Sequence, residues 1–338
     1  MDFELDDDQQ ALRDAARELL DDRSSSAHVR AVVDADTPGA PDPKLWAAMV
    51  DQGWTAIAAP EDAGGVGLGW VEVAVLLEQV GAHVAPAPIL QQIVAADALT
   101  GDADRVGALL SGEMVAAVAW SGRREVVPYA PIAGVVVAVD GDELIACTLS
   151  GASAEPAMDR TRVVGWFDPA QVSDRVVLGG ADAVRRHLDL GATAYAAELL
   201  GASQHMLDES VAYAKDRVQF DKPIGSFQAV KHRLADMLVD VEGMRSAVYY
   251  AAWCLAAGHE DASVAASTAK AWCSDASKRV MGSALQVHGG IGFTWEHDTH
   301  LYLKRAQLDQ LAFGDATFHR TRLAALLRPK VEAGESVL

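Results

Sequence analysis

The sequence is poor in cysteine and in basic residues. Its three cysteines, Cys147, Cys254 and Cys273, are spaced too widely for a disulfide framework or a zinc site, so we expect buried thiols in a reducing compartment. Lysine and arginine number 28 against 48 acidic residues, which gives a formal net charge of −20. Because so acidic a chain repels phosphate backbones and anionic lipids, we expect neither nucleic acid nor a membrane surface as a partner.

Long hydrophobic runs are absent as well. No run of roughly 18 apolar residues occurs, so the sequence predicts no membrane span. Residues 1–10 are acidic and lack the apolar core of a signal peptide, so we expect a cytoplasmic protein. Half of the 338 residues are hydrophobic and 22% are charged, which is the composition of a folded globular protein. We expect no metal site.

Three regions of different pattern follow one another along the chain. Residues 1–106 have helical periodicity with a glycine-rich loop at 60–69, and residues 107–182 contain short valine-rich segments that predict a small β domain. The Gly141–Asp142 pair suits a tight hairpin turn between two of these segments. Residues 183–338 return to long helical patterns, which predict an antiparallel bundle. The expected helices span residues 5–23, 43–52, 70–81, 185–216, 226–257, 261–286, 297–308 and 314–328.

Three segments carry motifs in the order of a known family. Residues 45–81 contain Pro-Glu-x-x-Gly-Gly-x-Gly, residues 216–237 contain a version of Arg-x-x-Phe-Gly-x-Pro-Ile-x-x-Phe-Gln, and residues 286–306 begin with Gln-x-x-Gly-Gly-x-Gly. Together they resemble the acyl-CoA dehydrogenase family over nearly the whole chain. The resemblance implies an α+β, mainly α fold with an N-terminal helical domain, a small middle β-barrel domain and a C-terminal four-helix bundle.

The resemblance also implies FAD as the cofactor and acyl-CoA thioesters as substrates, oxidised to 2-enoyl-CoA in β-oxidation. In that reaction a carboxylate base takes the α-proton while the β-hydrogen leaves as hydride to the flavin. The family binds FAD between subunits, so oligomerisation and an electron-transfer acceptor are implied as well.

Residues on the ADP side of FAD are retained. The resemblance assigns Arg217 to the pyrophosphate, which a planar guanidinium suits, and Phe220 to the adenine. The pair Gly289–Gly290 lets a backbone approach the dinucleotide of the neighbouring subunit, although it would also serve as a helix C-cap. The expected cofactor-binding residues are Arg217, Gln219, Phe220, Phe227, Gln228, Gln286, Val287, His288, Gly289 and Gly290.

The positions of the catalytic base are not carboxylates. The family places a glutamate at one of two positions, which fall here on Gly191 and Phe313, and its substrate-contacting arginine falls on Ala192. Asp315 is the acid nearest to the second position and is our candidate base. Glu198 lies on the same helix face as Gly191, about 10 Å along the axis, and is either a weaker candidate for the base, a polar helix residue or a buried ion-pair partner.

Segments that contact the flavin ring in the family are also missing. The sequence AVAWSGRREV at 117–126 stands in place of Thr-Glu-Pro-x-x-Gly-Ser-Asp, and no Trp-x-Thr strand is recognisable. Asp221 replaces a motif glycine, which is tolerable because aspartate can adopt a positive φ.

The chain therefore resembles the short, partly degenerate subunits of actinobacterial α2β2 acyl-CoA dehydrogenases, which act on bulky, steroid-type side chains. Such a subunit would donate the ADP-side half of the FAD site to its partner. Two alternatives stay open at this point: a self-sufficient homotetrameric dehydrogenase that uses Asp315, and a flavin-free structural subunit.

Overall fold

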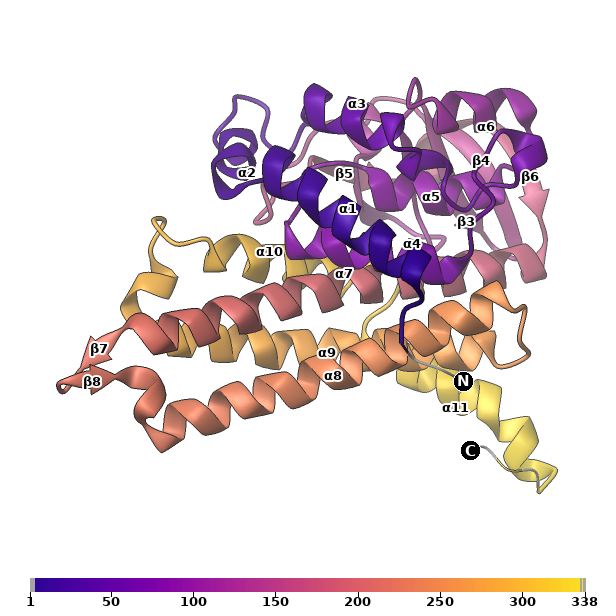
Figure 1. Cartoon of the computed structure of the whole chain (residues 1–338). Coiled ribbons are helices and arrows are strands. Elements are labelled where there is room, and N and C mark those ends of the chain that lie inside the picture. Colours follow the sequence, from indigo (N-terminus) through magenta and orange to yellow (C-terminus); the bar gives the residue numbers. More distant parts are fainter. Residues whose placement is uncertain (1–3, 335, 337–338) are drawn as a thin grey trace.

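The structure, a computed structural model, describes residues 4–334 and 336. Its N-terminal part is helical and lies along one side of the bundle (Figure 1). The helices of this part are α1 (Asp7–Arg23), α2 (Ser26–Val33), α3 (Pro43–Asp51), α4 (Trp70–Ala82), α5 (Ile89–Ala98) and α6 (Ala103–Leu110). The expected helices at 5–23, 43–52 and 70–81 are confirmed as α1, α3 and α4.

The middle part consists of β-strands, as expected, and they form two ladders. A four-stranded sheet has the order β1 (Ala116–Val118), β3 (Val135–Asp140), β4 (Glu143–Leu149), β6 (Val172–Gly179). The second ladder pairs β2 (Glu125–Pro128) with β5 (Val164–Phe167). The chain leaves the first sheet after β1 because the Glu125 carboxylate accepts hydrogen bonds from the amides of Trp120 and Ser121, which closes a turn.

The two ladders enclose a small core of their own. Val127 and Phe167 of the second ladder pack with Ala138 and Ile145 of the four-stranded sheet. The hairpin predicted at Gly141–Asp142 is confirmed, since Asp140 pairs with Glu143 on either side of this turn.

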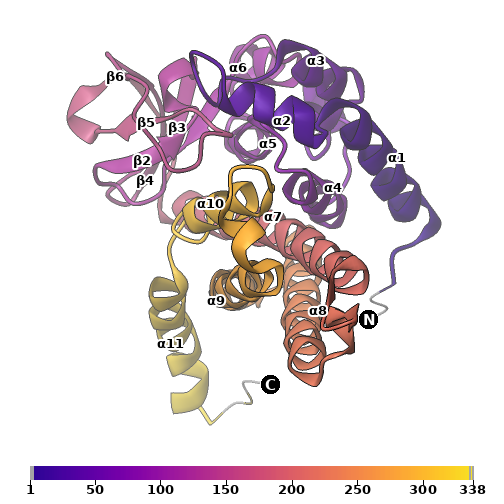
Figure 2. The ribbon, with the colours of Figure 1, turned by 90° about the vertical axis from the view of Figure 1, so that its left-hand side faces the viewer.

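The C-terminal part is a bundle of long helices. Helices α7 (Ala181–Asp216), α8 (Gln228–Ala256) and α9 (Ala262–His288) pack against one another, and α10 (Thr299–Asp309) packs on α7 and α9. Helix α11 (Ala316–Glu332) lies against α9 (Figures 1 and 2). A short hairpin of β7 (Val218–Gln219) and β8 (Lys222–Pro223) connects α7 to α8.

Helices α4 and α7 cross at unusually short range. A Cβ on Gly81 of α4 would collide with the backbone of Glu198, and one on Gly201 of α7 would collide with the backbone of Glu78. The two glycines therefore let the helix backbones touch, and this contact fixes the position of the Glu198 backbone relative to α4.

One hydrophobic core runs through all three parts. It extends from Leu20 of α1 through Val137 of the sheet to Val280 of α9. The boundaries at 106/107 and 182/183 stay predictions. None of the helices in the described residues is long and apolar enough to cross a bilayer.

Candidate functional site

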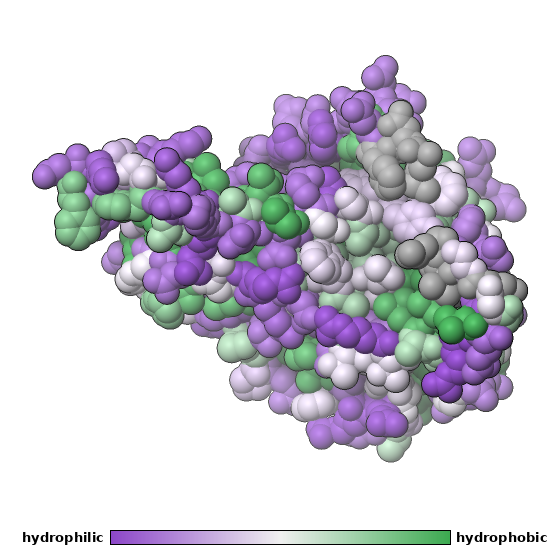
Figure 3. Space-filling view, turned by 90° about the horizontal axis from the view of Figure 1, so that it is seen from below, coloured by the Kyte–Doolittle hydropathy of each residue, from purple (hydrophilic) through white to green (hydrophobic). Residues whose placement is uncertain are grey.

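The hairpin between α7 and α8 forms an exposed tip at one end of the bundle. Phe220 and Asp221, its two central residues, have φ values of 56° and 64°, as a tight two-residue hairpin requires. The tolerance expected of Asp221 is thus seen, although Phe220 shares the same strained backbone region. Phe220 is 85% exposed and meets the ring of Phe227 edge-on at 6.1 Å. Figure 3 shows this end projecting from the body of the molecule.

Polar groups on this tip are available to a ligand. Arg217 ends α7 and is exposed, and its guanidinium has no carboxylate partner among the described residues. Within the described part of the chain, the side chain of Gln219 bonds only to the carbonyl of Val218 beside it, and that of Gln228 only to His232 one turn along α8. The tip therefore presents a free cation and two loosely held amides.

The end of α9 lies at the same end of the bundle (Figure 1). Gly289 has a φ of 62°, and a Cβ at Gly289 or Gly290 would meet nothing within 4 Å, so this backbone is open to approach. Gln286 is exposed and Val287 is buried. His288 is buried, its Nδ1 donates to the carbonyl of Ala284 at 2.8 Å, and its Nε2 has no partner in residues 4–334 and 336.

These features fit the ADP side of FAD. The unpaired guanidinium of Arg217 matches a pyrophosphate, and the open Gly289–Gly290 backbone matches a dinucleotide that approaches from outside. The imidazole of His288 also packs within the protein, because its ring stacks on Tyr213 at 4.7 Å, and burial lowers its pKa. The orphaned Nε2 of His288 leaves one buried hydrogen-bonding atom for a ligand.

The two base positions of the family lie against each other. Phe313, in the loop between α10 and α11, inserts its ring into a slot on α7 made by His187, Gly191 and Tyr195, which are spaced four residues apart on one helix face. The ring centroids of His187 and Tyr195 lie 5.1 and 5.7 Å from that of Phe313. A Cβ on Gly191 would be closer to this ring than the 3.0 Å that real Cβ atoms keep.

Lys270 of α9 fixes the loop that carries Phe313. This lysine is fully buried, and its Nζ donates to the carbonyls of Asp309, Gln310 and Gly314 at 2.9 to 3.0 Å. Burial lowers the pKa of Lys270 to about 7. These bonds hold the backbone on both sides of Phe313.

Asp315 is engaged as a helix cap. It is the N-cap of α11, and its Oδ1 accepts from the amide of Phe318 at 2.8 Å. The ring of Phe318 in turn meets Trp120 edge-on at 5.0 Å, so Trp120 is packed against protein on this side.

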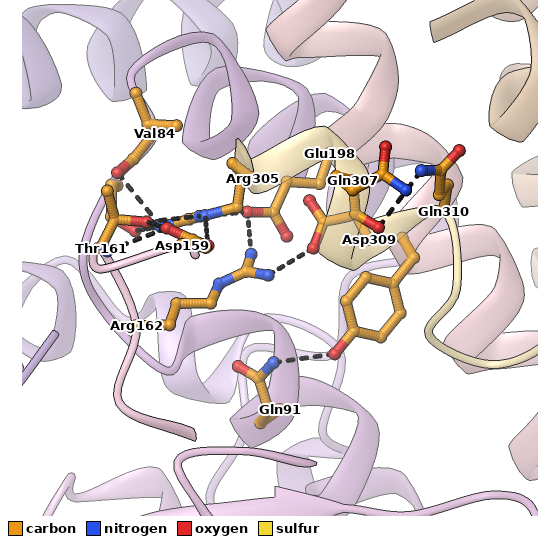
Figure 4. Close-up of polar contacts among 12 residues, drawn as sticks. Val84, Gln91, Asp159, Thr161, Arg162, Glu198, Arg305, Gln307, Asp309 and Gln310 are labelled. Carbon is orange, nitrogen blue, oxygen red and sulfur yellow. Dashed lines mark hydrogen bonds and ion pairs between the residues drawn. The ribbon is translucent and has the colours of Figure 1, made fainter. Parts of the chain in front are cut away.

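Glu198 is part of a buried charge cluster (Figure 4). Its Oε1 accepts from Arg162, which lies between β4 and β5, and from Arg305 of α10 at 2.7 Å. Arg305 also pairs with Asp159 at 3.1 Å, and Arg162 pairs with Asp309. All five side chains are at most 2% exposed. The structure thus confirms Glu198 as a buried ion-pair partner.

Sequence reasoning missed the other members of this cluster. Burial raises the pKa of the Asp309 carboxyl to about 7, although Arg162 opposes the shift. The sequence carried no clear signal, because Asp159 and Arg162 lie beside Arg160 and Thr161, and Arg305 and Asp309 lie near Lys304 and Gln307.

Comparison with known proteins agrees with the motifs. Family models described as Acyl-CoA dehydrogenase, N-terminal domain, and Acyl-CoA dehydrogenase, C-terminal domain, match residues 6–101 and 179–327. Acyl-CoA dehydrogenase IpdE2 of Mycolicibacterium smegmatis is 34% identical over 324 residues, 95% of this chain and 99% of the relative. The chain belongs to the acyl-CoA dehydrogenase family, and its class is that of oxidoreductases that act on acyl-CoA with FAD.

One chain in each of two solved structures resembles this chain over nearly its whole length. The ChsE4-ChsE5 complex from Mycobacterium tuberculosis contains a chain that superposes with a TM-score of 0.86 at 27% identity, covering 97% of this chain and 99% of that one. A variant of the Tcur3481-Tcur3483 steroid ACAD gives a TM-score of 0.84 at 27% identity, with 96% and 99% covered.

Proposed function

We propose that this chain is one subunit of a hetero-oligomeric, FAD-dependent acyl-CoA dehydrogenase and supplies the ADP-side half of the cofactor site to a base-bearing partner. One observation carries the proposal: the ring of Phe313 fills the space beside Gly191. The residue at one family base position therefore takes up the space at the other. An acyl group has neither room nor a carboxylate there. The α-proton is then removed by a carboxylate of the partner subunit.

Bound FAD supplies the hydride acceptor of this chemistry. The role of the present chain is binding and orientation. Arg217 contacts the pyrophosphate through charge-assisted hydrogen bonds, and Phe220 packs on the adenine. The open backbone at Gly289–Gly290 approaches the dinucleotide. Supporting contacts come from Gln219, Phe227, Gln228, Gln286, Val287 and His288.

A bulky, steroid-type acyl-CoA is the substrate class that we propose. The support comes from the two similar assemblies, one of which is described as a steroid ACAD. The small residues of α7 do not add to it, because Phe313 fills the space at Gly191, and Ala192 and Ala194 are buried. The acyl pocket therefore belongs to the partner. An α2β2 assembly, an electron-transfer acceptor and a cytoplasmic location complete the proposal.

The self-sufficient alternative requires Asp315 to act as the base. Its carboxylate would have to leave the amide of Phe318, and Phe313 would have to leave its slot. No feature of the described residues favours these two rearrangements.

The test is the visible absorption spectrum of the purified chain, alone and co-expressed with each base-bearing family member of its source genome. For the chain alone, we expect no flavin absorption that acyl-CoAs bleach. For the complex, we expect one FAD per pair, and acyl-CoAs should bleach its absorption. Flavin near one per chain that bleaches in the chain alone would overturn the proposal.

A variant of the hairpin tests the assigned role. Arg217→Ala should lower the affinity of the pair for FAD by roughly tenfold to a hundredfold, the usual effect of losing a hydrogen bond to a charged group. Arg185→Ala, at the opposite end of α7, removes another exposed arginine and should leave FAD binding unchanged. Equal FAD affinities for the two variants would contradict the assignment of Arg217.

A further inference from the structure

Two carboxylates of the buried charge cluster each have one oxygen that receives no hydrogen bond. Arg162 binds the other oxygen of each, since its Nη2 donates to Oε1 of Glu198 and its Nη1 donates to Oδ1 of Asp309. Because one guanidinium binds both carboxylates, they lie side by side (Figure 4). The remaining oxygens, Glu198 Oε2 and Asp309 Oδ2, are buried and have no partner among residues 4–334 and 336. A buried oxygen of this kind costs free energy unless it accepts a hydrogen bond.

The groups around this pair do not supply the missing hydrogen bonds. The charged and titratable groups in and beside the cluster are Asp159, Arg162, Arg305, Lys270, Tyr129 and Tyr195. Within the described part of the chain, none of them donates to either free oxygen. Lys270 approaches Asp309 from α9, but its Nζ donates only to backbone carbonyls and to the hydroxyl of Ser274. Its pKa of about 7 leaves this lysine only partly charged at neutral pH.

The cluster also has more carboxylates than guanidinium groups. Asp159, Glu198 and Asp309 face only Arg162 and Arg305, and all five side chains are at most 2% exposed. A water molecule between the free oxygens would satisfy their hydrogen bonds but leave the surplus negative charge in the core. A metal cation would be repelled by the guanidinium groups, and the described residues hold no group of three or more His, Cys, Asp or Glu that could bind one. A proton solves both problems, because a carboxylic acid is neutral and its O–H donates to the oxygen opposite.

We propose that Glu198 and Asp309 share one proton in the folded chain, so that one of them is a carboxylic acid that donates a hydrogen bond to the other. Two carboxylates that occupy one site do not readily ionise together. Burial raises the pKa of Asp309 to about 7, and the charge of Glu198 adds to this shift, although Arg162 opposes it. The proton stabilises the end of α10, where the carbonyl of Asp309 also accepts from Lys270 at 3.0 Å. It acts within a single chain, so the inference does not depend on the proposed function.

Infrared spectroscopy of the full chain at about pH 6 detects the proton, because surface carboxylates are ionised at that pH. A protonated carboxyl has a carbonyl stretch that is separate from the stretches of a carboxylate and that shifts in heavy water. We expect this band in the difference spectra between the unsubstituted chain and both Asp309→Asn and Glu198→Gln, since either amide supplies the missing N–H donor. Glu143→Gln removes a surface carboxylate paired with Arg175, and its difference spectrum should lack the band. Absence of the band for either of the two buried positions would overturn the inference.

Denaturant unfolding at pH 6 and pH 8 tests the same proton through its effect on stability. A carboxyl whose pKa is raised in the folded chain stabilises the fold at low pH, and this contribution is lost as the pH rises through about 7. The amide of Asp309→Asn keeps its donor at both pH values. Raising the pH should therefore increase the unfolding equilibrium constant of the unsubstituted chain about tenfold more than that of Asp309→Asn. Other titrating groups, such as His187 and Lys270, are common to both chains and cancel in this comparison. Glu143→Gln should follow the unsubstituted chain, and an equal change in Asp309→Asn would show that the pair is ionised in the folded chain.

Discussion

The ring of Phe313 rests on the Cα of Gly191, with His187 and Tyr195 on either side of it. Phe313 holds this place with a φ of 55°, a backbone region in which a phenylalanine is strained. It is 1% exposed, so burial of its ring compensates for the strain. Gly191 and Phe313 are therefore coupled, and neither can change size without the other.

The first prediction follows from this coupling. Gly191→Ala adds a methyl group against the Phe313 ring and should lower the free energy of unfolding by about 1–3 kcal/mol through overpacking. Gly282→Ala is the matched control, because Gly282 also lies inside a long helix but its Cβ would meet nothing within 4 Å. There the higher helix propensity of alanine should stabilise the chain by about 0.5–1 kcal/mol. Denaturant unfolding measures both, and the same sign of change at the two positions would contradict the slot geometry.

Asp315 yields a prediction that separates a cap from a base. Asp315→Asn keeps a side-chain oxygen for the amide of Phe318, so we expect unchanged stability and unchanged acyl-CoA oxidation by the pair. Asp315→Ala should lower the free energy of unfolding by about 1 kcal/mol through loss of the N-cap, with the specific activity of the folded pair preserved. Abolished activity in the asparagine variant would restore Asp315 as a base.

We expect the buried cluster around Glu198 to tolerate substitution poorly. Glu198→Ala removes the carboxylate oxygen that accepts from both Arg162 and Arg305, each of which keeps one aspartate partner, and the buried donors left unsatisfied should cost about 1–3 kcal/mol of stability. Glu143→Ala is the comparison, because Glu143 pairs with Arg175 on the surface, where loss of an ion pair costs about 0–1 kcal/mol. Thermal or denaturant unfolding gives both values. Similar losses at the two positions would mean that the cluster is hydrated in solution.

Helix α1 could be predicted from the periodicity of its sequence, and helices α5 and α2 could not. Helix α1 buries only one face, including Ala16 and Leu20, so its periodicity is visible. Helix α5 is buried over eight consecutive residues, Ile89–Ala96, so it has no polar face to reveal its period. Helix α2 begins three residues after α1 ends, which leaves little sequence between them to mark a boundary.

The candidate site, too, could be predicted only in part from the sequence. The motifs identified the exposed hairpin and the α9 end, because those positions depend on local turn chemistry around residues such as Asp221 and Gly289. The sequence also showed that both base positions had lost their carboxylates. It could not show that Gly191 and Phe313 touch, because that contact depends on how the α10–α11 loop packs on α7. The partners of Glu198 were hidden for the same reason, since Arg162 and Arg305 come from distant segments.

His187, in the slot around Phe313, makes the stability of the fold depend on pH. Its ring is buried, its Nε2 donates to the carbonyl of Ala119 at 3.1 Å, and burial lowers its pKa from 6.5 to about 4. Between these two values the unfolded chain binds a proton that the folded chain does not, so this group stabilises the fold above pH 6.5 and the contribution is lost as the pH falls towards 4. His205 and His319 have pKa values lowered to about 4 for the same reason and act in the same direction. Asp309, with a pKa raised to about 7, acts in the opposite direction between about pH 4 and 7.

A single substitution isolates the contribution of His187. Between pH 7 and pH 5 this histidine should account for a loss of about 2 kcal/mol of stability, so His187→Gln should reduce the pH-dependent loss by that amount. The comparison uses the difference between two pH values within each variant, which removes any direct cost of the substitution. His28→Gln, at an exposed position of α2, should reproduce the pH dependence of the unsubstituted chain. If His187→Gln loses as much stability on acidification as the unsubstituted chain, then His187 takes up its proton in the folded state, and the slot around Phe313 is open to water.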